Sequence, residues 1–439
     1  MPFEAIDPPQ NNSLAGHRKI AVIGAGISGM GAAHMLGDDH QVTLFESCPR
    51  LGGHARTKMA GKNGDQPVDT GFIVFNYANY PNLAALFKEL DVPVIKSNMS
   101  FGASIDGGRL EYGLMTLDSI FAQRRNALNP KFLRMLTDIV RFNSTATKLA
   151  QDRTLTIAGF LDKLGAGEYF RKYYLTPLSG AIWSTPVDKI MDFPAYSMID
   201  FFENHALLSH TGQHQWYTVK GGSQEYVNRL GASLTAKGVD IRLGTPVQSV
   251  RRTPLGAEVK THGAEWEAFD EVVFASHSDD TLALLADPSA AERAALGAVK
   301  YQPNDVVLHA DASVMPKLRK TWASWIYAED KGQKSDRIDL TYWMNSLQPI
   351  PMDDPHFVTL NTKRPIREEL IYDQVTLRHP VYDLGALAAQ EQVRAFNGTQ
   401  NTWFCGAWMK HGFHEDGLSS AVDVVQGLRA KAKVALAAE

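Results

Sequence analysis

The chain is poor in cysteine, with only Cys48 and Cys405 among its 439 residues. Two cysteines so far apart supply neither a disulfide framework nor the closely spaced thiols of a metal site. The chain also lacks an apolar run of about 18 residues, the length that a membrane-spanning helix needs. An excess of one charge is missing too, since the net charge is −4. We therefore expect a cytoplasmic protein with no general affinity for nucleic acid.

Length and composition favour a large folded core. Hydrophobic residues make up 44% of the 439 residues, which is enough for two domains. Residues 1–17 are polar, contain Pro8 and Pro9, and lack the apolar stretch of a signal peptide. We expect them to form a flexible N-terminal tail.

A glycine fingerprint follows the first strand-like run. Residues 19–24 lead into Gly24-x-Gly26-x-x-Gly29, and Glu46 ends the next apolar run. Gly24 permits a tight turn, Gly26 lets the backbone approach a pyrophosphate, and Gly29 lets the following helix pack on the strand. The helix N-terminus stabilises phosphate charge, and Glu46 can accept hydrogen bonds from ribose hydroxyls. This spacing predicts a bound dinucleotide.

Short apolar runs suited to a parallel sheet lie far apart in the chain. They occupy residues 19–24, 41–46, 271–276 and 402–407. Between them, residues 76–215 are mostly helical in pattern and residues 301–395 contain alternating strand-like runs. We therefore expect an α/β fold with an inserted α+β domain. The predicted nucleotide-binding domain comprises residues 18–75, 216–300 and 396–439, and the predicted substrate domain comprises residues 76–215 and 301–395.

A second glycine pair, Gly52 and Gly53, follows Arg50 shortly after Glu46. A large dinucleotide needs close backbone approach again along its length, and cations beside its diphosphate. This stretch resembles the flavin-containing amine oxidase and phytoene desaturase superfamily, whose pattern is an acid followed by R-x-G-G-R. Here His54 stands in place of the second arginine. The resemblance implies non-covalent FAD and an amine oxidase-like two-domain fold with a Rossmann-like FAD-binding domain.

Three further stretches are similar to motifs of the same superfamily. They are Val68–Asp69–Thr70–Gly71–Phe72, Gly244–Thr245–Pro246–Val247, and Phe404–Cys405–Gly406–Ala407 followed by His414–Ala421. The resemblance implies that the first approaches the flavin, that Val247 contacts adenine, and that a helix begins beneath the isoalloxazine. A helix N-terminus placed there favours the reduced flavin, because negative charge develops on reduction. The predicted cofactor contacts are Gly24, Gly26, Ile27, Ser28, Gly29, Glu46, Ser47, Arg50, Gly52, Gly53, His54, Ala55, Gly71, Phe72, Val247, Ala275, Gly406, Glu415, Asp416, Gly417 and Leu418.

Four phrases resemble a bacterial subgroup of this superfamily. They are A-I-W-S-T-P at residues 181–186, Y-T-V-K-G-G-S at 217–223, T-Y-W-M-N at 341–345 and G-F-H-E-D-G at 412–417. The subgroup is linked to enzymes that form cyclopropane and methyl-branched fatty acids, and one branch desaturates a methyl-branched acyl chain on the way to furan fatty acids. The resemblance implies a fatty acyl lipid substrate and a fatty-acid methyltransferase as partner.

Two other functions remain open on the sequence. A flavin amine oxidase acting on a small amine would need aromatic side chains near the flavin, which Trp183, Tyr217 and Trp408 could supply. The other function is that of an accessory protein, which would bind flavin and a methyltransferase without catalysing a reaction itself. Catalytic residues are unknown, because hydride transfer to a flavin needs few side chains. The candidates are Tyr342 and Asn345 on opposite faces of one predicted strand, and also His309 and His414.

Several residues of the second flavin motif have side chains that also suit covalent flavin attachment, metal binding or helix capping. Cys405 invites covalent flavin attachment, but a small buried residue is the favoured interpretation. His411 and His414 have metal-ligand spacing only on a helix, and Gly412 and Gly417 favour a turn instead, so no metal is expected. The other interpretations are contact of this stretch with the flavin or the pocket mouth, and capping of the next helix by Asp416.

A basic amphipathic helix is predicted from Lys131 to Lys148. The predicted apolar stripe contains Phe132, Leu133, Leu136, Ile139 and Val140, and the opposite face carries Lys131, Arg134, Arg141 and Lys148, after Arg124 and Arg125. Packing of the stripe on the domain core is the favoured interpretation. The alternative is peripheral contact with the inner face of a membrane, which a phospholipid substrate would require somewhere on the protein.

Overall fold

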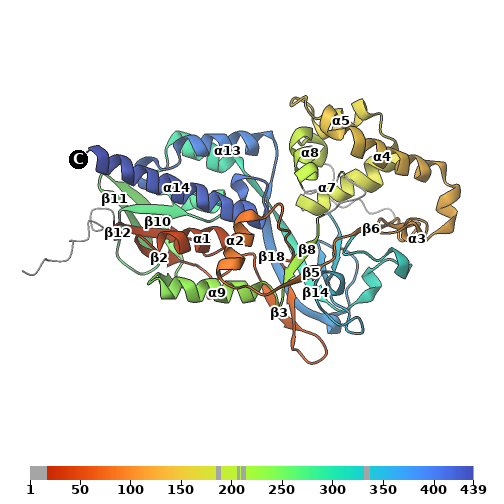
Figure 1. The fold of residues 1–439 in the computed structure, drawn as a ribbon, viewed down its shortest axis with the longest axis horizontal. Coiled ribbons are helices and arrows are strands. Elements are labelled where there is room, and N and C mark those ends of the chain that lie inside the picture. The colour runs from red at the N-terminus through yellow and green to blue at the C-terminus, as the bar shows by residue number, and fades with distance from the viewer. Residues whose placement is uncertain (1–16, 184–188, 205–207, 209–213, 331–336, 439) are drawn as a thin grey trace, which may run out of the picture. The chain divides into compact units, whose positions relative to one another are not determined.

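The computed structural model describes the chain apart from residues 1–16, 184–188, 205–207, 209–213, 331–336 and 439 (Figure 1). Residues 1–16 of the expected tail therefore lie outside the described part. The contacts gather into two compact units, each built from separate stretches of chain. Unit 1 comprises Met1–Gly53, Asn228–Gly297 and Gln390–Glu439, and unit 2 comprises His54–Val227 and Ala298–Ala389.

The bounds of these units differ from the predicted domain bounds, mainly at residues 54–75 and 216–227. The sequence joined both stretches to the nucleotide-binding pieces, whereas their contacts place them in unit 2. Contacts with other parts of unit 2 are the reason. Strand β3 (Thr57–Ala60) pairs with β4 (Gln66–Asp69), whose Asp69 accepts from the Gln348 amide. Strand β8 (Trp216–Val219) pairs with β5 (Val94–Ser97). The assignment of FAD binding and substrate binding to separate domains stays a prediction.

Unit 1 is built on a five-stranded parallel sheet with the order β19-β13-β1-β2-β9. Its strands are β1 (Lys19–Ile23), β2 (Gln41–Phe45), β9 (Asp240–Arg242), β13 (Glu271–Phe274) and β19 (Thr402–Phe404). The central strand β1 is apolar and buried, as expected of a strand covered on both faces. Four of the five strands match the runs predicted from the sequence, and β9 completes the sheet.

Helices and a small antiparallel sheet complete unit 1. The helices are α1 (Ile27–Leu36), α10 (Ser278–Leu284), α11 (Ala290–Ala298), α14 (His414–Ala438) and the 3-10 turns η7 (Thr399–Asn401) and η8 (Ala407–Met409). The antiparallel strands are β10 (Val247–Thr253), β11 (Gly256–Thr261) and β12 (Glu267–Phe269). Helices α9 (Ser223–Ala236) and α13 (Leu384–Phe396) each contain a boundary between the units, and the last residue of α11 belongs to unit 2.

Unit 2 contains a seven-stranded mixed sheet with the order β18-β14-β17-β16-β15-β6-β7. Its strands are β6 (Phe101–Ile105), β7 (Leu110–Gly113), β14 (Lys300–His309), β15 (Trp325–Glu329), β16 (Leu340–Trp343), β17 (Phe357–Leu360) and β18 (Ile371–Val381). Only β6 and β15 pair in parallel among these strands. The alternating strand-like runs predicted in residues 301–395 thus form most of this sheet.

The helices of unit 2 lie mainly between β7 and β8 in the chain. They are α2 (Pro81–Glu89), α3 (Leu117–Ile120), α4 (Pro130–Leu149), α5 (Ile157–Leu164), α6 (Glu168–Phe170), α7 (Thr176–Trp183), α8 (Ala195–Asn204) and α12 (Met344–Leu347). The described residues of unit 2 also contain one π-helical turn, η2 (Arg171–Leu175), and five 3-10 turns. These are η1 (Arg124–Leu128), η3 (Lys189–Asp192), η4 (Ala312–Val314), η5 (Arg319–Thr321) and η6 (Glu368–Leu370).

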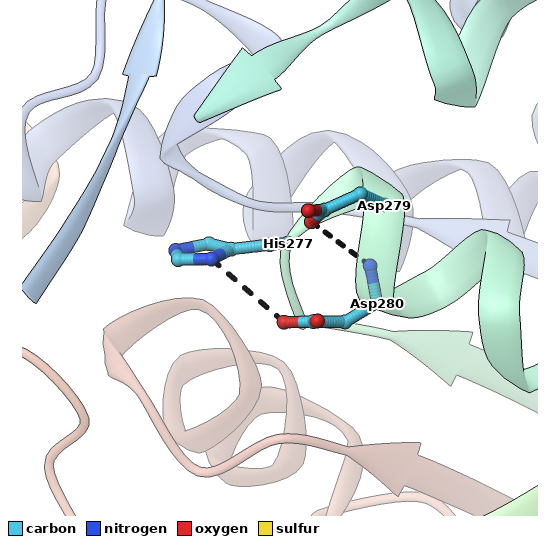
Figure 2. Close-up of side chains that lie close together, drawn as sticks. All are labelled: His277, Asp279 and Asp280. Atoms are coloured by element: carbon cyan, nitrogen blue, oxygen red, sulfur yellow. Dashed lines mark hydrogen bonds and ion pairs between the residues drawn. The ribbon is translucent and has the colours of Figure 1, made fainter. Parts of the chain in front are cut away.

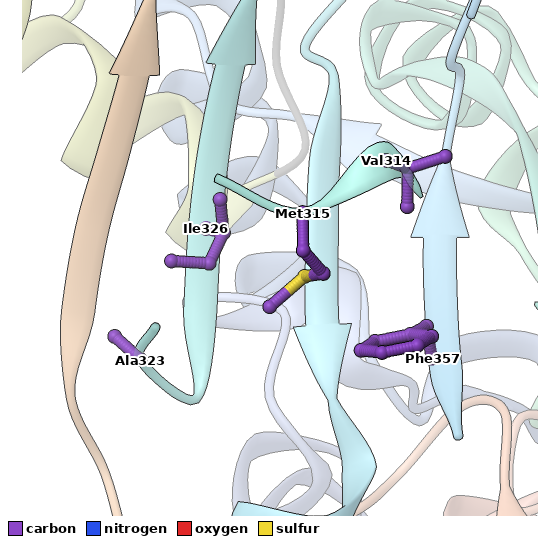
Figure 3. Packing of buried hydrophobic residues seen from close by; sticks show 5 residues of the cluster. All are labelled: Val314, Met315, Ala323, Ile326 and Phe357. Carbon is purple, nitrogen blue, oxygen red and sulfur yellow. The ribbon is translucent and has the colours of Figure 1, made fainter. Parts of the chain in front are cut away.

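One face of the unit 2 sheet carries a compact apolar cluster. Figure 3 shows Val314, Met315, Ala323, Ile326 and Phe357 packed together, and each is at most 6% exposed. Two tryptophans, Trp322 and Trp343, cover the cluster with their rings 5.4 Å apart in a T-shaped arrangement. Such packing fixes the sheet rigidly beneath the loops that follow its strands.

Helix α4 confirms the predicted helix but corrects its apolar face. The stripe prediction is wrong for Leu133 and Val140, which are exposed. The buried face instead runs from Phe132 through Ile139 to Phe142. Among the described helices, none combines the length and apolar character needed to cross a lipid bilayer.

Candidate FAD site

The turn from β1 into α1 has the geometry that its glycines predict. Gly24 has a φ of +102°, and a Cβ there would lie 3.0 Å from the carbonyl oxygen of Ala275. A Cβ on Gly29 would lie 1.8 Å from the carbonyl oxygen of Gly24, so only glycine lets the helix start this close to the strand. By contrast, nothing lies within 4 Å of a Cβ built on Gly26. The turn is therefore tight on its inner side and open at Gly26.

Gly26 is also the N-cap of α1, and no side chain caps this helix. The first N–H groups of a helix have no partners within it and carry partial positive charge. Ile27 and Ser28 provide the first of these groups next to the open space at Gly26. Such a terminus binds a phosphate without further help from side chains.

The second glycine turn lies directly against the first one. The N–H of Gly52 donates to the carbonyl oxygen of Ala25 at 2.8 Å, and a Cβ on Gly53 would lie 2.9 Å from the Cα of Gly26. Both Gly52 and Gly53 have positive φ angles, +107° and +56°. The Arg50 guanidinium bonds the carbonyl oxygens of Leu51 and Gly53, at 3.2 and 2.7 Å. It therefore lies beside the paired glycine turns, as a diphosphate contact requires.

Glu46 joins the loops at the end of β2. One carboxylate oxygen accepts from the Ala25 N–H at 2.7 Å, and the other accepts from the Cys48 N–H at 2.8 Å. The Ser47 hydroxyl lies 3.2 Å from the second oxygen. The oxygen that accepts from Ala25 has a further lone pair, so these bonds leave capacity for a ribose hydroxyl.

The loop before Val247 is attached to the same region. The Thr245 N–H donates to the carbonyl oxygen of Glu46 at 2.8 Å, and the Gly244 N–H donates to that of Cys48 at 2.9 Å. Val247 then begins β10. The structure thus brings the predicted adenine contact next to the predicted ribose contact.

The second flavin motif meets the first through α14. A Cβ on Gly417 would lie 2.8 Å from the Ser28 hydroxyl and 3.0 Å from Cγ2 of Ile27. One turn further along α1, a Cβ on Gly31 would lie 2.4 Å from Cδ1 of Leu418. Glycine at 31 and 417 therefore lets the starts of α1 and α14 touch.

The start of α14 corrects the prediction that Gly417 lies in a turn. The turn is at Gly412, whose φ is +94°, and the helix already begins at His414. Asp416 lies in the first helical turn and accepts from the N–H groups of Phe413 at 2.9 Å and His411 at 3.2 Å. Asp416 thus caps the helix from within it. Burial raises the pKa of Asp416, and the charges of His411 and Lys410 oppose this shift.

Sequence reasoning missed the link that Ser420 makes within this motif. Its hydroxyl accepts from the Gly406 N–H at 2.9 Å and donates to the carbonyl oxygen of Gly417 at 2.8 Å. Gly406 has a φ of +153°, and a Cβ there would overlap the Trp408 indole. The position of Ser420, one helical turn after Gly417, was the signal available in the sequence.

Comparison with known proteins identifies the family. The family model of flavin-containing amine oxidoreductases matches residues 27–355 of this chain. The chain belongs to this family. The flavoprotein accordingly uses FAD, and the residues of unit 1 fit this cofactor: the open space at Gly26, the uncapped start of α1 and the adjacent Arg50 suit a diphosphate, while Glu46 suits a ribose.

Two characterised relatives match the flavoprotein over short segments. A coproporphyrinogen III oxidase from Mycobacterium bovis is 43% identical over 77 residues, which is 17% of this chain and 16% of that protein. The flavin-dependent L-tryptophan oxidase RebO from Lentzea aerocolonigenes is 45% identical over 53 residues, 12% of this chain and 11% of that protein. The chain thus matches only a small part of the length of these relatives.

Solved structures match the flavoprotein over nearly its whole length. A CLA-producing fatty acid isomerase from P. acnes has 15% identity and a TM-score of 0.65, covering 93% of this chain and 98% of that one. A cyclohexylamine oxidase from Brevibacterium oxydans has 13% identity and a TM-score of 0.67, covering 94% and 100%. At these identities the likeness establishes the amine oxidase-like α/β fold.

Four predicted cofactor contacts, His54, Ala55, Gly71 and Phe72, lie in unit 2. The carbonyl oxygen of His54 accepts from the Phe72 N–H at 3.1 Å, and a Cβ on Gly71 would lie 1.9 Å from that same oxygen. The structure therefore brings the two ends of this predicted group together within unit 2. The His54 ring lies 5.6 Å from the ring of His379.

Asp69, in the V-D-x-G motif, is the centre of a buried polar network. Its carboxylate accepts from the Thr57 hydroxyl at 2.6 Å, from the N–H and hydroxyl of Ser223 at 2.8 Å each, and from the Gln348 amide at 2.9 Å. The network joins β3, β4, α9 and the loop after α12. Burial raises the pKa of Asp69 to about 6, and the hydrogen bonds lower it again only in part. Sequence reasoning missed Ser223 as a partner, although it follows the quoted glycine pair.

The catalytic candidates His309 and Asn345 make hydrogen bonds within unit 2. The N–H of Asp311 donates to Nδ1 of His309 at 3.1 Å, so Nε2 carries the proton and faces the Thr359 hydroxyl at 2.7 Å. Burial lowers the pKa of His309 to about 4. The Asn345 amide donates to the carbonyl oxygens of Pro351 and Asp354, at 2.7 and 2.8 Å.

The predicted strand through Asn345 is wrong at its end. Strand β16 stops at Trp343, and Asn345 lies in α12. Tyr342 remains on the strand, with its ring 5.4 Å from that of Trp325, and burial raises its pKa. His414 is the first residue of α14 in unit 1. As catalytic groups, all four residues stay predictions.

The aromatic residues named for an amine pocket have separate places. Trp408 is buried in unit 1 and donates to the carbonyl oxygen of Ser276 at 3.1 Å. Tyr217 lies on β8 of unit 2, with its ring 4.9 Å from that of Tyr77. The side chain of Trp183 lies outside the described part. Cys405 is fully buried, and burial raises the pKa of its thiol to about 12, which keeps it protonated and unreactive.

Among the described residues, one group of three side chains has the spacing of metal ligands. Figure 2 shows His277, Asp279 and Asp280 at the start of α10, with ligand atoms within 4.8 Å of one another. His277 is the N-cap of this helix and both acids lie in its first turn. Negative charge at a helix start is favourable without a metal, so the group has a local structural explanation.

Proposed function

We propose that this flavoprotein oxidises a methyl-branched or otherwise modified fatty acyl chain of a phospholipid, forming a carbon–carbon double bond. One observation supports a redox reaction in particular. In unit 1 the two glycine turns lie against each other, and the start of α1 contacts the start of α14, in a chain of the flavin-containing amine oxidoreductase family. When bound, FAD accepts the electron pair of a C–H bond as hydride. The adjacent carbon would lose its proton to a base, and the electron pair of that C–H bond would form the double bond.

The residues of this chain have a limited share in such chemistry. Gly26, the start of α1 and Arg50 would hold the diphosphate, and Glu46 would hold a ribose. The start of α14, held against Ile27 and Ser28, would place its positive end near the flavin. His309 and Asn345 are engaged in hydrogen bonds inside unit 2, so neither is assigned as the base that accepts the proton. Positioning and exclusion of water are enough for hydride transfer.

Support for an acyl substrate comes from the subgroup phrases at residues 181–186, 217–223, 341–345 and 412–417. A fatty acid isomerase among the structural neighbours is consistent with a lipid chain in this fold. We also propose a fatty-acid methyltransferase as the partner that supplies the branched chain. Amine oxidation is the second candidate, because the family name and the cyclohexylamine oxidase neighbour favour it.

Anaerobic single-turnover mixing tests the proposal. The FAD-loaded protein is mixed with branched acyl phospholipids, with small amines or with a porphyrinogen, and the visible band of oxidised flavin is followed. Bleaching by the acyl lipid alone, with a product lighter by two hydrogens in mass spectrometry, is the expected result. Bleaching by amines or by the porphyrinogen instead would contradict the substrate class. A band that never bleaches would indicate an accessory protein without turnover.

Cells provide a second test that needs no purified substrate. Membrane lipids are compared by mass spectrometry from cells that express a fatty-acid methyltransferase with this protein, or with its Gly26→Ala variant as control. We expect branched chains lighter by two hydrogens only with the unchanged protein. Identical lipid profiles in both cultures would contradict the proposal.

A further inference from the structure

Residues 115–148 of unit 2, which we name the basic segment, expose an unusual number of large apolar side chains. Leu117 is 76% exposed and Leu128 is 87% exposed, although exposing an apolar side chain to water is unfavourable in free energy. On α4, Leu133 and Val140 are 40% and 55% exposed. Residues seven apart lie on one face of a helix, so these two form one apolar stripe. Met115, 53% exposed, completes the set.

The core of unit 2 does not account for this stripe. The buried face of α4 consists of Phe132, Met135, Asp138, Ile139, Phe142 and Ala146. Leu133 and Val140 therefore lie outside the buried face of the helix. Exposed apolar side chains that gather in one segment mark an interaction surface.

The charge of the basic segment is opposite to that of the whole chain. It contains Arg124, Arg125, Lys131, Arg134, Arg141 and Lys148 against only Asp118 and Asp138, whereas the chain as a whole has a net charge of −4. Asp138 is buried and bonded by the N–H of Gly167 at 2.8 Å. The side chains of Arg124, Lys131 and Arg134 are 70%, 65% and 64% exposed, although each lies within 4 Å of a carboxylate, those of Asp118, Glu168 and Asp138.

Ion pairs hold the start of the basic segment, one within the segment and one to η5. Asp118, next to Leu117, pairs with Arg124 at 2.6 Å and with Lys320 at 2.8 Å. Asn129 then caps α4 directly after Leu128, accepting from the N–H of Lys131 at 3.1 Å. Exposed apolar side chains and cations are thus held on one continuous stretch of folded chain.

We propose that the basic segment docks this protein on the surface of an anionic lipid bilayer. Its leucines and Val140 would enter the boundary between headgroups and acyl chains, and its arginines and lysines would contact the lipid phosphates. Charge complementarity selects this occupant, because the excess of cations matches an anionic surface and the apolar stripe matches its interior. The proposal deepens the proposed function, since a phospholipid acyl substrate lies in a bilayer.

Vesicle sedimentation with the FAD-loaded protein tests the docking. Vesicles of phosphatidylcholine alone are compared with vesicles that also contain phosphatidylglycerol. We expect retention on the anionic vesicles, weakened by salt. The Leu117→Ser/Leu128→Ser and Leu133→Ser/Val140→Ser variants should each bind about tenfold more weakly. The control Leu255→Ser/Leu384→Ser, which removes two exposed leucines elsewhere, should bind like the unchanged protein.

The cations are tested in the same assay. Lys131→Gln/Lys148→Gln should lose roughly tenfold or more in affinity for anionic vesicles, and Lys88→Gln/Arg293→Gln, with the same loss of charge, should lose much less. Equal loss in both pairs, or no vesicle binding at all, would overturn the proposal. Retention that the leucine variants leave unchanged would point to an acidic protein partner instead. Self-association abolished by these variants would point to a second copy of the chain.

Binding is measured without turnover, so the docking and the proposed activity can fail separately. Docking variants should still bleach their flavin with detergent-dispersed acyl lipid at the unchanged rate. Vesicle binding by a protein that oxidises only amines would leave the docking intact and remove the proposed substrate.

Discussion

At the scale of single residues, the glycines of unit 1 divide into two kinds. Gly29 is required by the protein itself, because a Cβ there would lie 1.8 Å from a backbone oxygen. Gly26 is not, because nothing lies within 4 Å of its Cβ position and its φ of −75° suits any residue. A glycine that the fold does not require suits close approach of a ligand, and we predict that this ligand is the FAD diphosphate.

This distinction predicts different results for two alanine variants. Gly26→Ala should fold with nearly unchanged stability but bind FAD at least about tenfold more weakly, because its methyl group takes the space of a phosphate. Gly29→Ala should lose about 3 kcal/mol or more of folding free energy even without FAD. Urea unfolding of the apoproteins and FAD titration separate the two effects. Gly297→Ala, where a Cβ has ordinary contacts, serves as control.

Asp69 makes the stability of unit 2 depend on pH. Its pKa is raised by burial from 3.8 to about 6, so the folded protein holds this proton more tightly than the unfolded chain. The stabilisation is complete below pH 4 and is lost as the pH rises to 6 and above, by roughly 3 kcal/mol. Asp69→Asn should abolish this part of the slope in urea unfolding across that range. Parallel pH profiles for both proteins would contradict the assigned pKa.

At the scale of elements, packing decides which face of a helix is buried. The predicted stripe on α4 included Val140 because its spacing from Phe132 and Ile139 is nearly helical. The structure buries Phe142 instead, whose ring meets those of Phe160 and Phe170 at 6.0 and 5.5 Å. Aromatic side chains from other helices thus rotate the buried face away from Val140.

The two positions on α4 should therefore respond differently to truncation. Phe142→Ala should cost about 3–5 kcal/mol of unfolding free energy, because it leaves a cavity among the rings. Val140→Ala should change stability by no more than about 0.5 kcal/mol, since its side chain is already in water. Urea unfolding of both variants measures the difference. Equal losses would show that the stripe is covered in solution.

At the scale of the whole molecule, FAD should protect the parts of unit 1 that are distant in sequence. Residues 24–29, 46–53 and 406–418 contact one another through the paired glycines, so one ligand should slow hydrogen exchange in all three together. At about a hundredfold excess over its Kd, FAD should add about 2.7 kcal/mol to stability. Exchange mass spectrometry with and without FAD checks this. Protection confined to β10–β12 would contradict the site.

The sequence predicted the family, the strands of the parallel sheet and the reasons for Gly24 and Gly29, because each depends on short segments whose local geometry permits few alternatives. It could not place Ser420, Ser223 or the network of Asp69, since these residues meet partners that lie far away in the chain. It also extended β16 through Asn345. There the amide bonds to a loop several residues further along, and these contacts favour a helical turn.

The sequence alone determined that the cofactor is FAD, and the fixed order of glycines, Glu46 and Arg50 predicts where its diphosphate and ribose bind. What only the tertiary structure decided is which surfaces remain open. Gly26 is open because the second glycine turn packs beside it rather than over it, and Leu133 and Val140 are exposed because α4 turns its aromatic face inward. Burial depends on the neighbours that folding brings together, and a local sequence pattern does not specify which residues these are.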